Sequence, residues 1–180
     1  MQVYEALGRA LDLATRVLEH ARPATWGRPT PCAEWDVRAV ARHLVVGADA
    51  FADVLLGRPP DLTGAAVDDT DLAGALLRAS ARGLVGWAGP GALQRRSGVP
   101  GVPLADLHLL EAVVHGHDLA VALRRPYDLD DEAVELTLQL FQNAPLDRPR
   151  AAGDFAPQLR VGPARPALEQ LLGVVGRRSG

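Results

Sequence analysis

Apolar residues recur at helical spacing along most of the chain. In residues 3–20, Leu7, Leu11 and Val17 belong to one apolar side while acidic and basic residues lie opposite, which is typical of an amphipathic helix. The same period marks three more long segments and two shorter ones. The six expected helices cover residues 3–20, 37–56, 71–87, 104–123 and 131–143, and a last segment with Pro166 in its first turn. The pattern predicts an all-α protein.

Prolines, glycines and capping residues separate these helices. The second helix should stop at Gly57, and residues 88–104 hold too many glycines and prolines for a helix but could form a short extended stretch. The candidate N-terminal caps are Asp36 for the second helix, Asp69 or Thr70 for the third, and Asp128 or Asp130 for the fifth. We therefore expect one domain over residues 1–180, an up-down four-helix bundle with additional short C-terminal helices.

Composition agrees with a helical fold and narrows the function. The chain is 48% hydrophobic but only 4% aromatic, which fits a core of aliphatic side chains. Its net charge is −3, so it has no basic surface for nucleic acid. No segment approaches a membrane span, and the N-terminus is an amphipathic helix instead of a signal peptide, so we expect a cytoplasmic protein that binds neither nucleic acid nor membrane. The lone Cys32 excludes an internal disulfide and is expected in the core.

Ionisable residues interrupt the apolar segment HLLEAVVHGHDL, residues 108–119. Burying them is costly unless they are paired or bound to a metal. Glu111 lies on the apolar stripe, and His115 follows it by one turn, which brings their Cβ atoms to about 5–6 Å. His43 stands at the border of the buried side of the second helix. Two imidazoles and a carboxylate suit zinc, nickel or iron(II), although His43 could be an ordinary rim residue and Glu111 could pair with an arginine.

Neighbouring residues offer competing interpretations of this segment. His108 is a rival ligand, but two helical turns, about 10.5 Å, separate it from His115, so one ion should not bind both. His117 points to the other side of the helix and is expected on the surface. Asp118 points inward and could accept an N–H from a ligating imidazole.

Other partners of these residues remain open from the sequence. Asp118 could instead form a salt bridge with Arg42 or Arg38 of the second helix. Trp26 and Trp35 are expected to pack over the end of the bundle, although a tryptophan near a pocket mouth could also contact substrate.

Three segments resemble the actinobacterial DinB-like metal-binding proteins, which are related to the N-terminal domain of mycothiol-dependent maleylpyruvate isomerase. TPCAEWDVRAVARHLV, residues 30–45, is similar to the family's Thr-Pro-Cys, Trp, helix and His segment. EAVVHGHDLAVAL, residues 111–123, is similar to its Glu, His-Gly and Asp-Leu-Ala segment. The C-terminal residues 156–177 resemble the tail of single-domain members. The resemblance thus spans nearly the whole chain.

This resemblance implies a DinB-like four-helix bundle that holds one divalent metal ion through His43, Glu111 and His115. Zinc is the first choice, with nickel or iron as alternatives. Family enzymes are thought to activate the thiolate of a low-molecular-weight thiol, mycothiol or bacillithiol, toward an electrophilic substrate. The implied function is thiol transfer or isomerisation, with no catalytic residue assigned.

Two departures limit what the resemblance transfers. His117 stands where related sequences usually carry Trp, and the chain ends at Gly180 without the additional C-terminal domain of the two-domain isomerase. We therefore do not expect the isomerase activity itself. The alternatives are a non-enzymatic metal-binding or stress-response protein and a metal-free helical interaction protein that forms a homodimer.

Overall fold

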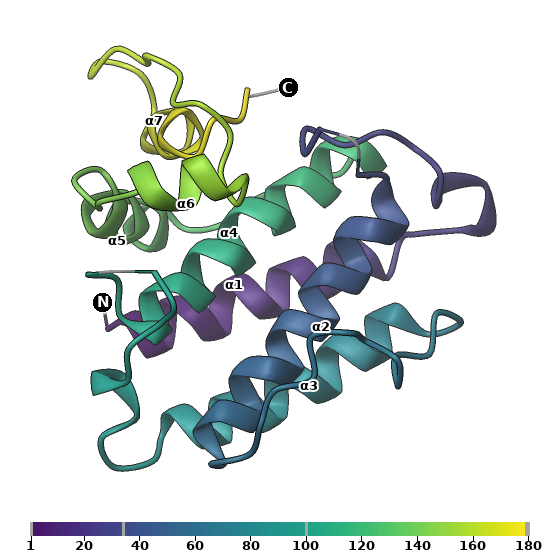
Figure 1. The fold of residues 1–180 in the computed structure, drawn as a ribbon. Helices are drawn as coiled ribbons and strands as arrows, with labels where there is room; N and C mark the ends of the chain where they lie inside the picture. The colour runs from purple at the N-terminus through teal and green to yellow at the C-terminus, as the bar shows by residue number, and fades with distance from the viewer. Residues whose placement is uncertain (1, 34, 100, 179–180) are drawn as a thin grey trace.

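The fold consists of helices and the loops between them (Figure 1). The computed structural model describes residues 2–33, 35–99 and 101–178, and these contain no strand, only two isolated β-bridges. The helices are α1 (Val3–Leu18), η1 (Pro23–Thr25), α2 (Val37–Leu55), α3 (Leu72–Trp87), η2 (Ala92–Gln94), α4 (Leu104–Leu123), α5 (Asp131–Phe141), α6 (Asp147–Ala152) and α7 (Ala167–Val174). The predicted all-α class, with a helical bundle and extra short helices, is confirmed.

Each of the four long helices packs against two others. Helix α1 lies against α4 and α3, and α2 lies against α3 and α4. Helices α1 and α2 are therefore diagonal to each other, and the connection of residues 19–36 crosses one end of the bundle. This connection carries Trp35 and Cys32 toward α4.

The four long helices do not simply alternate in direction along the chain, because α2 and α3 run the same way. Asp49 pairs with Arg82, and a Cβ on Gly86 would lie 2.9 Å from Leu55, so contacts between α2 and α3 advance together and the two helices are parallel. Helix α2 is about 28 Å long at 1.5 Å per residue. The connection of residues 56–71 is long enough to return the chain along that length.

Most helix boundaries follow from capping chemistry. Asp36 caps α2 and Asp130 caps α5, each accepting a hydrogen bond from the backbone N–H three residues on, as predicted. Helix α3 is capped by Asp71, so the prediction of Asp69 or Thr70 was wrong. Asp69 instead forms ion pairs with arginines of α2.

Two further differences lie in the C-terminal third. Helix α6 lies between the fifth and the last expected helices and is not among the six predicted, and Pro166 is the N-cap of α7 instead of a residue in its first turn. The expected extended stretch is limited to a single bridge between Arg96 and Pro103.

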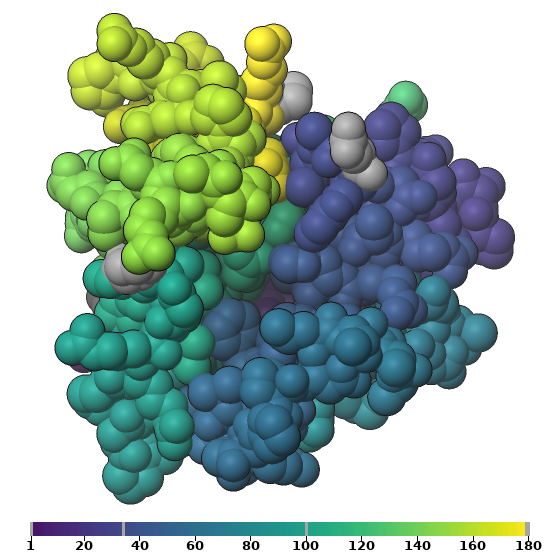
Figure 2. All heavy atoms as spheres, in the orientation of Figure 1, coloured from purple at the N-terminus to yellow at the C-terminus, as the bar shows by residue number. Residues whose placement is uncertain are grey.

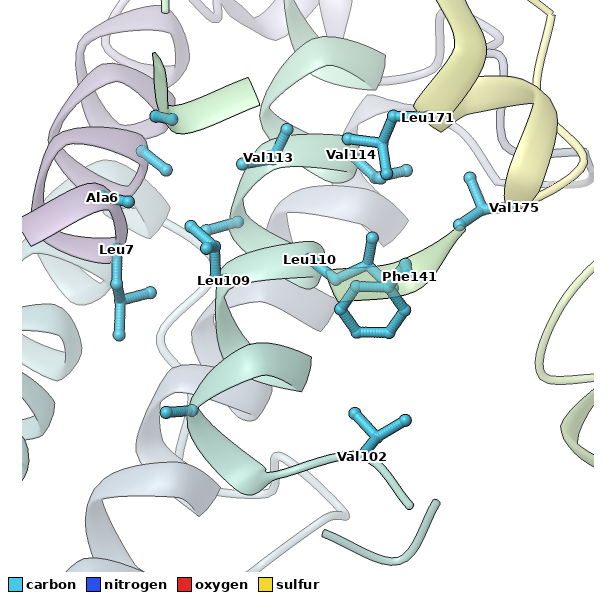
Figure 3. Close-up of a cluster of buried hydrophobic side chains, with 14 of the residues drawn as sticks. Ala6, Leu7, Val102, Leu109, Leu110, Val113, Val114, Phe141, Leu171 and Val175 are labelled. Atoms are coloured by element: carbon cyan, nitrogen blue, oxygen red, sulfur yellow. The ribbon is translucent and has the colours of Figure 1, made fainter. Parts of the chain in front are cut away.

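Helix α4 is the centre of the molecule and is buried on several sides. Figure 3 shows Leu109 on the side of α1, while Leu110 and Val114 lie toward Phe141 of α5 and Leu171 of α7. Other α4 residues, including Leu119, belong to a second cluster with α2 and α3. The C-terminal helices therefore cover a face of α4 that a four-helix bundle alone would leave exposed.

None of the described helices has the length and hydropathy needed to cross a bilayer.

Candidate metal centre

His43, Glu111 and His115 meet where α2 packs against α4. The His43 Nε2 atom lies 2.7 Å from Glu111 Oε2, and His115 Nε2 lies 3.3 Å from the same oxygen. Each residue offers one ligand atom, and all three atoms lie within 4.8 Å of one another. The structure thus brings together the three residues singled out in the sequence. That they bind a metal stays a prediction.

The local fold fixes each of the two helices that carry these residues. Asp36 sets the start of α2, and the buried Val40 and Leu44 hold the helix against α4 with His43 at the edge. Glu111 and His115 are one turn apart on α4, so both reach the same space. His43 and Glu111 are half-buried, whereas His115 is almost fully buried.

Asp118 orients His115. The His115 Nδ1 atom lies 3.0 Å from Asp118 Oδ2, and Asp118 is completely buried. A neutral imidazole that donates from Nδ1 carries its lone pair on Nε2, the nitrogen that faces Glu111. The predicted N–H contact to Asp118 is confirmed. The alternative salt bridge to Arg42 or Arg38 was wrong, because the arginine beside Asp118 is Arg177, with 3.5 Å between Nε and Oδ2.

Opposite charges shift the titration of the cluster. Burial would raise the pKa of Glu111, but hydrogen bonds with His115 and His43 outweigh it and hold that pKa well below its usual range. Burial would lower the pKa of His115, but Asp118 and Glu111 outweigh it and raise the pKa to about 9. A bound cation would therefore take the place of a proton on His115.

Cys32 belongs to a second group that could in principle hold an ion. Ligand atoms of Cys32, His115 and Asp118 also lie within 4.8 Å of one another. However, Arg177 Nη2 lies 2.9 Å from Cys32 Sγ, and its positive charge disfavours a metal ion there. Burial raises the pKa of the Cys32 thiol, which also keeps it protonated. The expected core position of Cys32 is confirmed, and the group with His43 and Glu111 fits a cation better.

Trp35 covers the cluster from the connection before α2. Its ring is stacked on His115 with centroids 5.7 Å apart and is tilted against His43 at 4.8 Å. The expectation of packing at the bundle end is thus incomplete, because Trp35 contacts both imidazoles. Trp26 lies farther away, under the guanidinium of Arg38.

His108 occupies a different environment from the three clustered residues. Trp87 Nε1 donates to His108 Nδ1 at 3.1 Å, and the imidazole stacks on Phe51 with centroids 4.1 Å apart. Burial lowers the pKa of His108 to about 3, so the ring is neutral at physiological pH. The interpretation of His108 as a rival ligand receives no support, since it lies outside both ligand groups.

His117 is buried, so the prediction of a surface position was wrong. Its ring packs edge-on against Tyr127 with centroids 5.8 Å apart, and its Nδ1 atom finds no hydrogen-bond partner among the described residues. Tyr127 folds back over α4 and donates to the Val113 carbonyl at 2.8 Å. Periodicity within α4 could not reveal this cover.

Arg177 is a site residue that sequence reasoning missed. It reaches Asp118 and Cys32 from the segment after α7, far along the chain. Nothing in the spacing near residue 118 indicates a partner so distant in sequence. From the sequence alone, an arginine near the C-terminus is expected to lie in solvent.

The fold and the cluster together define a class: an all-helical bundle with two histidines and a glutamate gathered between two of its helices. Comparison with known families agrees with this class. The family model described as the mycothiol maleylpyruvate isomerase N-terminal domain matches residues 7–120, so the chain belongs to this family. The matched range includes His43, Glu111 and His115, but not Arg177.

Two curated relatives are similar over nearly the full length. The uncharacterized proteins Rv0738 and MT0763, from two strains of Mycobacterium tuberculosis, are each 30% identical over 180 residues, covering 94% of this chain and 94% of their own length. No solved structure gives a significant match. The comparisons therefore support the mycothiol-related family but carry no assigned activity.

Proposed function

We propose that the protein binds one divalent metal ion, zinc in the first instance, through His43, Glu111 and His115. In this proposal the ion activates a low-molecular-weight thiol of the mycothiol type for transfer to, or isomerisation of, an electrophilic substrate in the cytoplasm. The observation that carries it is the approach of three suitable donor atoms, from two helices, to within 4.8 Å. Three protein ligands also leave coordination positions for a small molecule.

The surrounding residues fit a cation. The Glu111 carboxylate stays ionised because its pKa is well below the usual range. Asp118 accepts a hydrogen bond from Nδ1 of His115. The other ring nitrogen, Nε2, therefore faces Glu111. Two neutral imidazoles and one carboxylate leave a net positive charge on a bound divalent ion, which favours a thiolate beside it.

A bound divalent ion would lower the pKa of a thiol and so supply a sulfur nucleophile near neutral pH. The residues of the chain supply the rest. Trp35 covers one side of both imidazoles, and Asp118 keeps His115 in one orientation. For an unsaturated carbonyl acceptor, the S–H proton leaves, the sulfur electron pair forms the S–C bond, and the displaced π electrons take up a proton. The net reaction adds one thiol across the double bond and needs no oxidant.

Elemental analysis tests the metal. Wild-type protein should contain about one zinc, nickel or iron per chain, and His43→Ala should lose most of it. His20→Ala is the matched control, because His20 is exposed, follows the end of α1 and belongs to neither group of candidate ligands. Equal metal content in all three proteins would contradict the assignment of His43.

Calorimetry and a conjugation assay test the thiol. Mycothiol should bind to zinc-loaded wild type and react with an electrophile faster than in buffer. Binding should disappear after chelation and in His43→Ala. A metal-loaded protein that neither binds mycothiol nor accelerates conjugation would instead favour the non-enzymatic metal-binding alternative.

A further inference from the structure

A cavity of about 720 Å³ opens beside the candidate metal centre. Trp35, His43 and Glu111 form its wall at the cluster. The remainder is formed by α2, α4, Leu11 of α1 and the loops around residues 60–62, 98–99 and 153–155. Figure 2 shows the surface hollowed where these blue, teal and green parts of the chain meet. The volume lies in the range of small-molecule sites, roughly 300–1,000 Å³.

The lining of the cavity disfavours anions. No arginine lines it among the described residues, and the chain has no lysine. Besides His43 and His108, its ionisable lining residues are Glu111 and Asp154, both acidic. Most other lining side chains are apolar, among them Phe51, Val54 and Leu104. In the metal-free protein, a carboxylate inside would lose its hydration without gaining a cationic side chain as a partner.

His108 offers one polar contact in this apolar wall. Its Nδ1 accepts from Trp87, so the proton of the neutral ring is on Nε2, a hydrogen-bond donor. That nitrogen is buried and has no partner among the described residues, although His108 itself lines the cavity. A buried donor without a partner is unusual, and an acceptor on a ligand in the adjoining cavity would satisfy it.

We infer that this cavity binds an uncharged, largely apolar molecule whose carbonyl or similar oxygen accepts a hydrogen bond from His108 Nε2, with its body against Phe51 and Val54. In the metal-free protein the same lining disfavours a dicarboxylate. That this molecule is the electrophile attacked by the thiol rests on the proposed function, whereas its binding to the cavity does not.

The first test compares two probes of nearly equal size on metal-free protein. Benzylideneacetone is an uncharged aromatic enone, and trans-cinnamate carries a carboxylate instead of the methyl ketone. Titration followed by calorimetry should give saturable binding of the enone and at least tenfold weaker binding of cinnamate. Equal affinities, or no enone binding, would overturn the inference.

A cavity-filling variant locates the binding. Gly47 lines the cavity, and a Cβ there would meet no atom within 4 Å, so Gly47→Leu introduces a bulky side chain at the cavity wall with open space at its Cβ. It should weaken enone binding at least tenfold. Gly162→Leu is the matched control, because that position is equally open but lies outside the cavity. Unchanged binding in Gly47→Leu would place the probe elsewhere and contradict the inference.

A second variant tests the hydrogen bond. His108→Phe keeps a ring against Phe51 but removes the donor. It should weaken benzylideneacetone about tenfold, the effect of one hydrogen bond, while the corresponding hydrocarbon, trans-1-phenyl-1-butene, should bind as before. Equal changes for both probes would show that Nε2 does not contact the oxygen.

These measurements separate the cavity from the proposed function. Enone binding to metal-free protein, with no thiol conjugation after zinc loading, would support the cavity and refute the thiol chemistry. Conjugation that proceeds equally with maleate and with benzylideneacetone would support the thiol chemistry and refute the substrate class inferred here.

Discussion

Acid should destabilise the metal-free protein through His108. This residue is 2% exposed, and burial lowers its pKa from 6.5 to about 3 in the folded state. Between these values the unfolded chain binds a proton that the native protein does not. The stabilising contribution is therefore fully present above pH 6.5 and is lost as the pH falls from 6.5 toward 3.

The size of the effect follows from the two pKa values. Integration of the linkage relation between pH 7.5 and pH 5 gives a loss of about 2 kcal/mol in the free energy of unfolding. His115 acts in the opposite direction. Its folded pKa of about 9 means that its contribution is fully present below pH 6.5 and is lost as the pH rises toward 9. The effect of His108 must therefore be measured as a difference between proteins that share His115.

His108→Gln isolates this difference. Glutamine does not titrate, and its carbonyl can still accept from Trp87 Nε1. Chemical denaturation in chelator, followed by far-UV circular dichroism at pH 7.5 and pH 5, gives the free energy of unfolding of each protein. Relative to wild type, the variant should gain about 2 kcal/mol on going to pH 5. His20→Gln, at an exposed position, is the control and should follow the wild-type profile.

The result that refutes this reasoning is a constant difference. If wild type and His108→Gln keep the same separation in unfolding free energy from pH 7.5 to pH 5, the imidazole gains its proton without cost in the folded protein. The buried, neutral ring that the cavity inference uses would then also be wrong.

Three further changes test other parts of the structure. Asp118→Asn should weaken zinc affinity about 10- to 100-fold in a chelator competition, because the charged acceptor that orients His115 becomes a neutral amide; unchanged affinity would contradict the role of that charge. Gly116→Ala should cost about 1–3 kcal/mol in urea denaturation, since its Cβ would lie 2.8 Å from Tyr127 Oη, whereas Gly162→Ala, in open space, is the neutral control. Asp36→Ala should cost about 1 kcal/mol through the lost N-cap of α2, and a cost near zero would show that packing alone sets the start of that helix.

Local rules predicted the helices because their signals are local. The period of apolar residues located each long helix. Capping carboxylates located two helix starts, Asp36 for α2 and Asp130 for α5. The start of α3 was wrong because Asp69 is engaged by arginines of α2, a contact between segments that no local rule includes. The parallel course of α2 and α3 is likewise a property of packing.

The candidate cluster was predictable because two of its members are one turn apart and the third stands out on an apolar helix. The prediction of a surface position for His117 was wrong because it considered α4 alone. Assigning it to the surface assumed that α4 has a solvent face, but Tyr127 and the C-terminal helices cover that face. Residues 104–123 are rich in apolar side chains all round, which indicates a helix with neighbours on every side.

The C-terminal segment contributes to the site as well as to the core. Gly176 has φ +78°, and a Cβ there would lie 2.6 Å from Ala156, so the chain turns sharply at this point against residues 156–157. The turn directs Arg177 back to Asp118 and Cys32. The largely buried guanidinium of Arg177 balances the charge of the fully buried Asp118 carboxylate, which in turn contacts His115. A residue beyond the 7–120 range of the family model thus lies beside the carboxylate that contacts one candidate ligand.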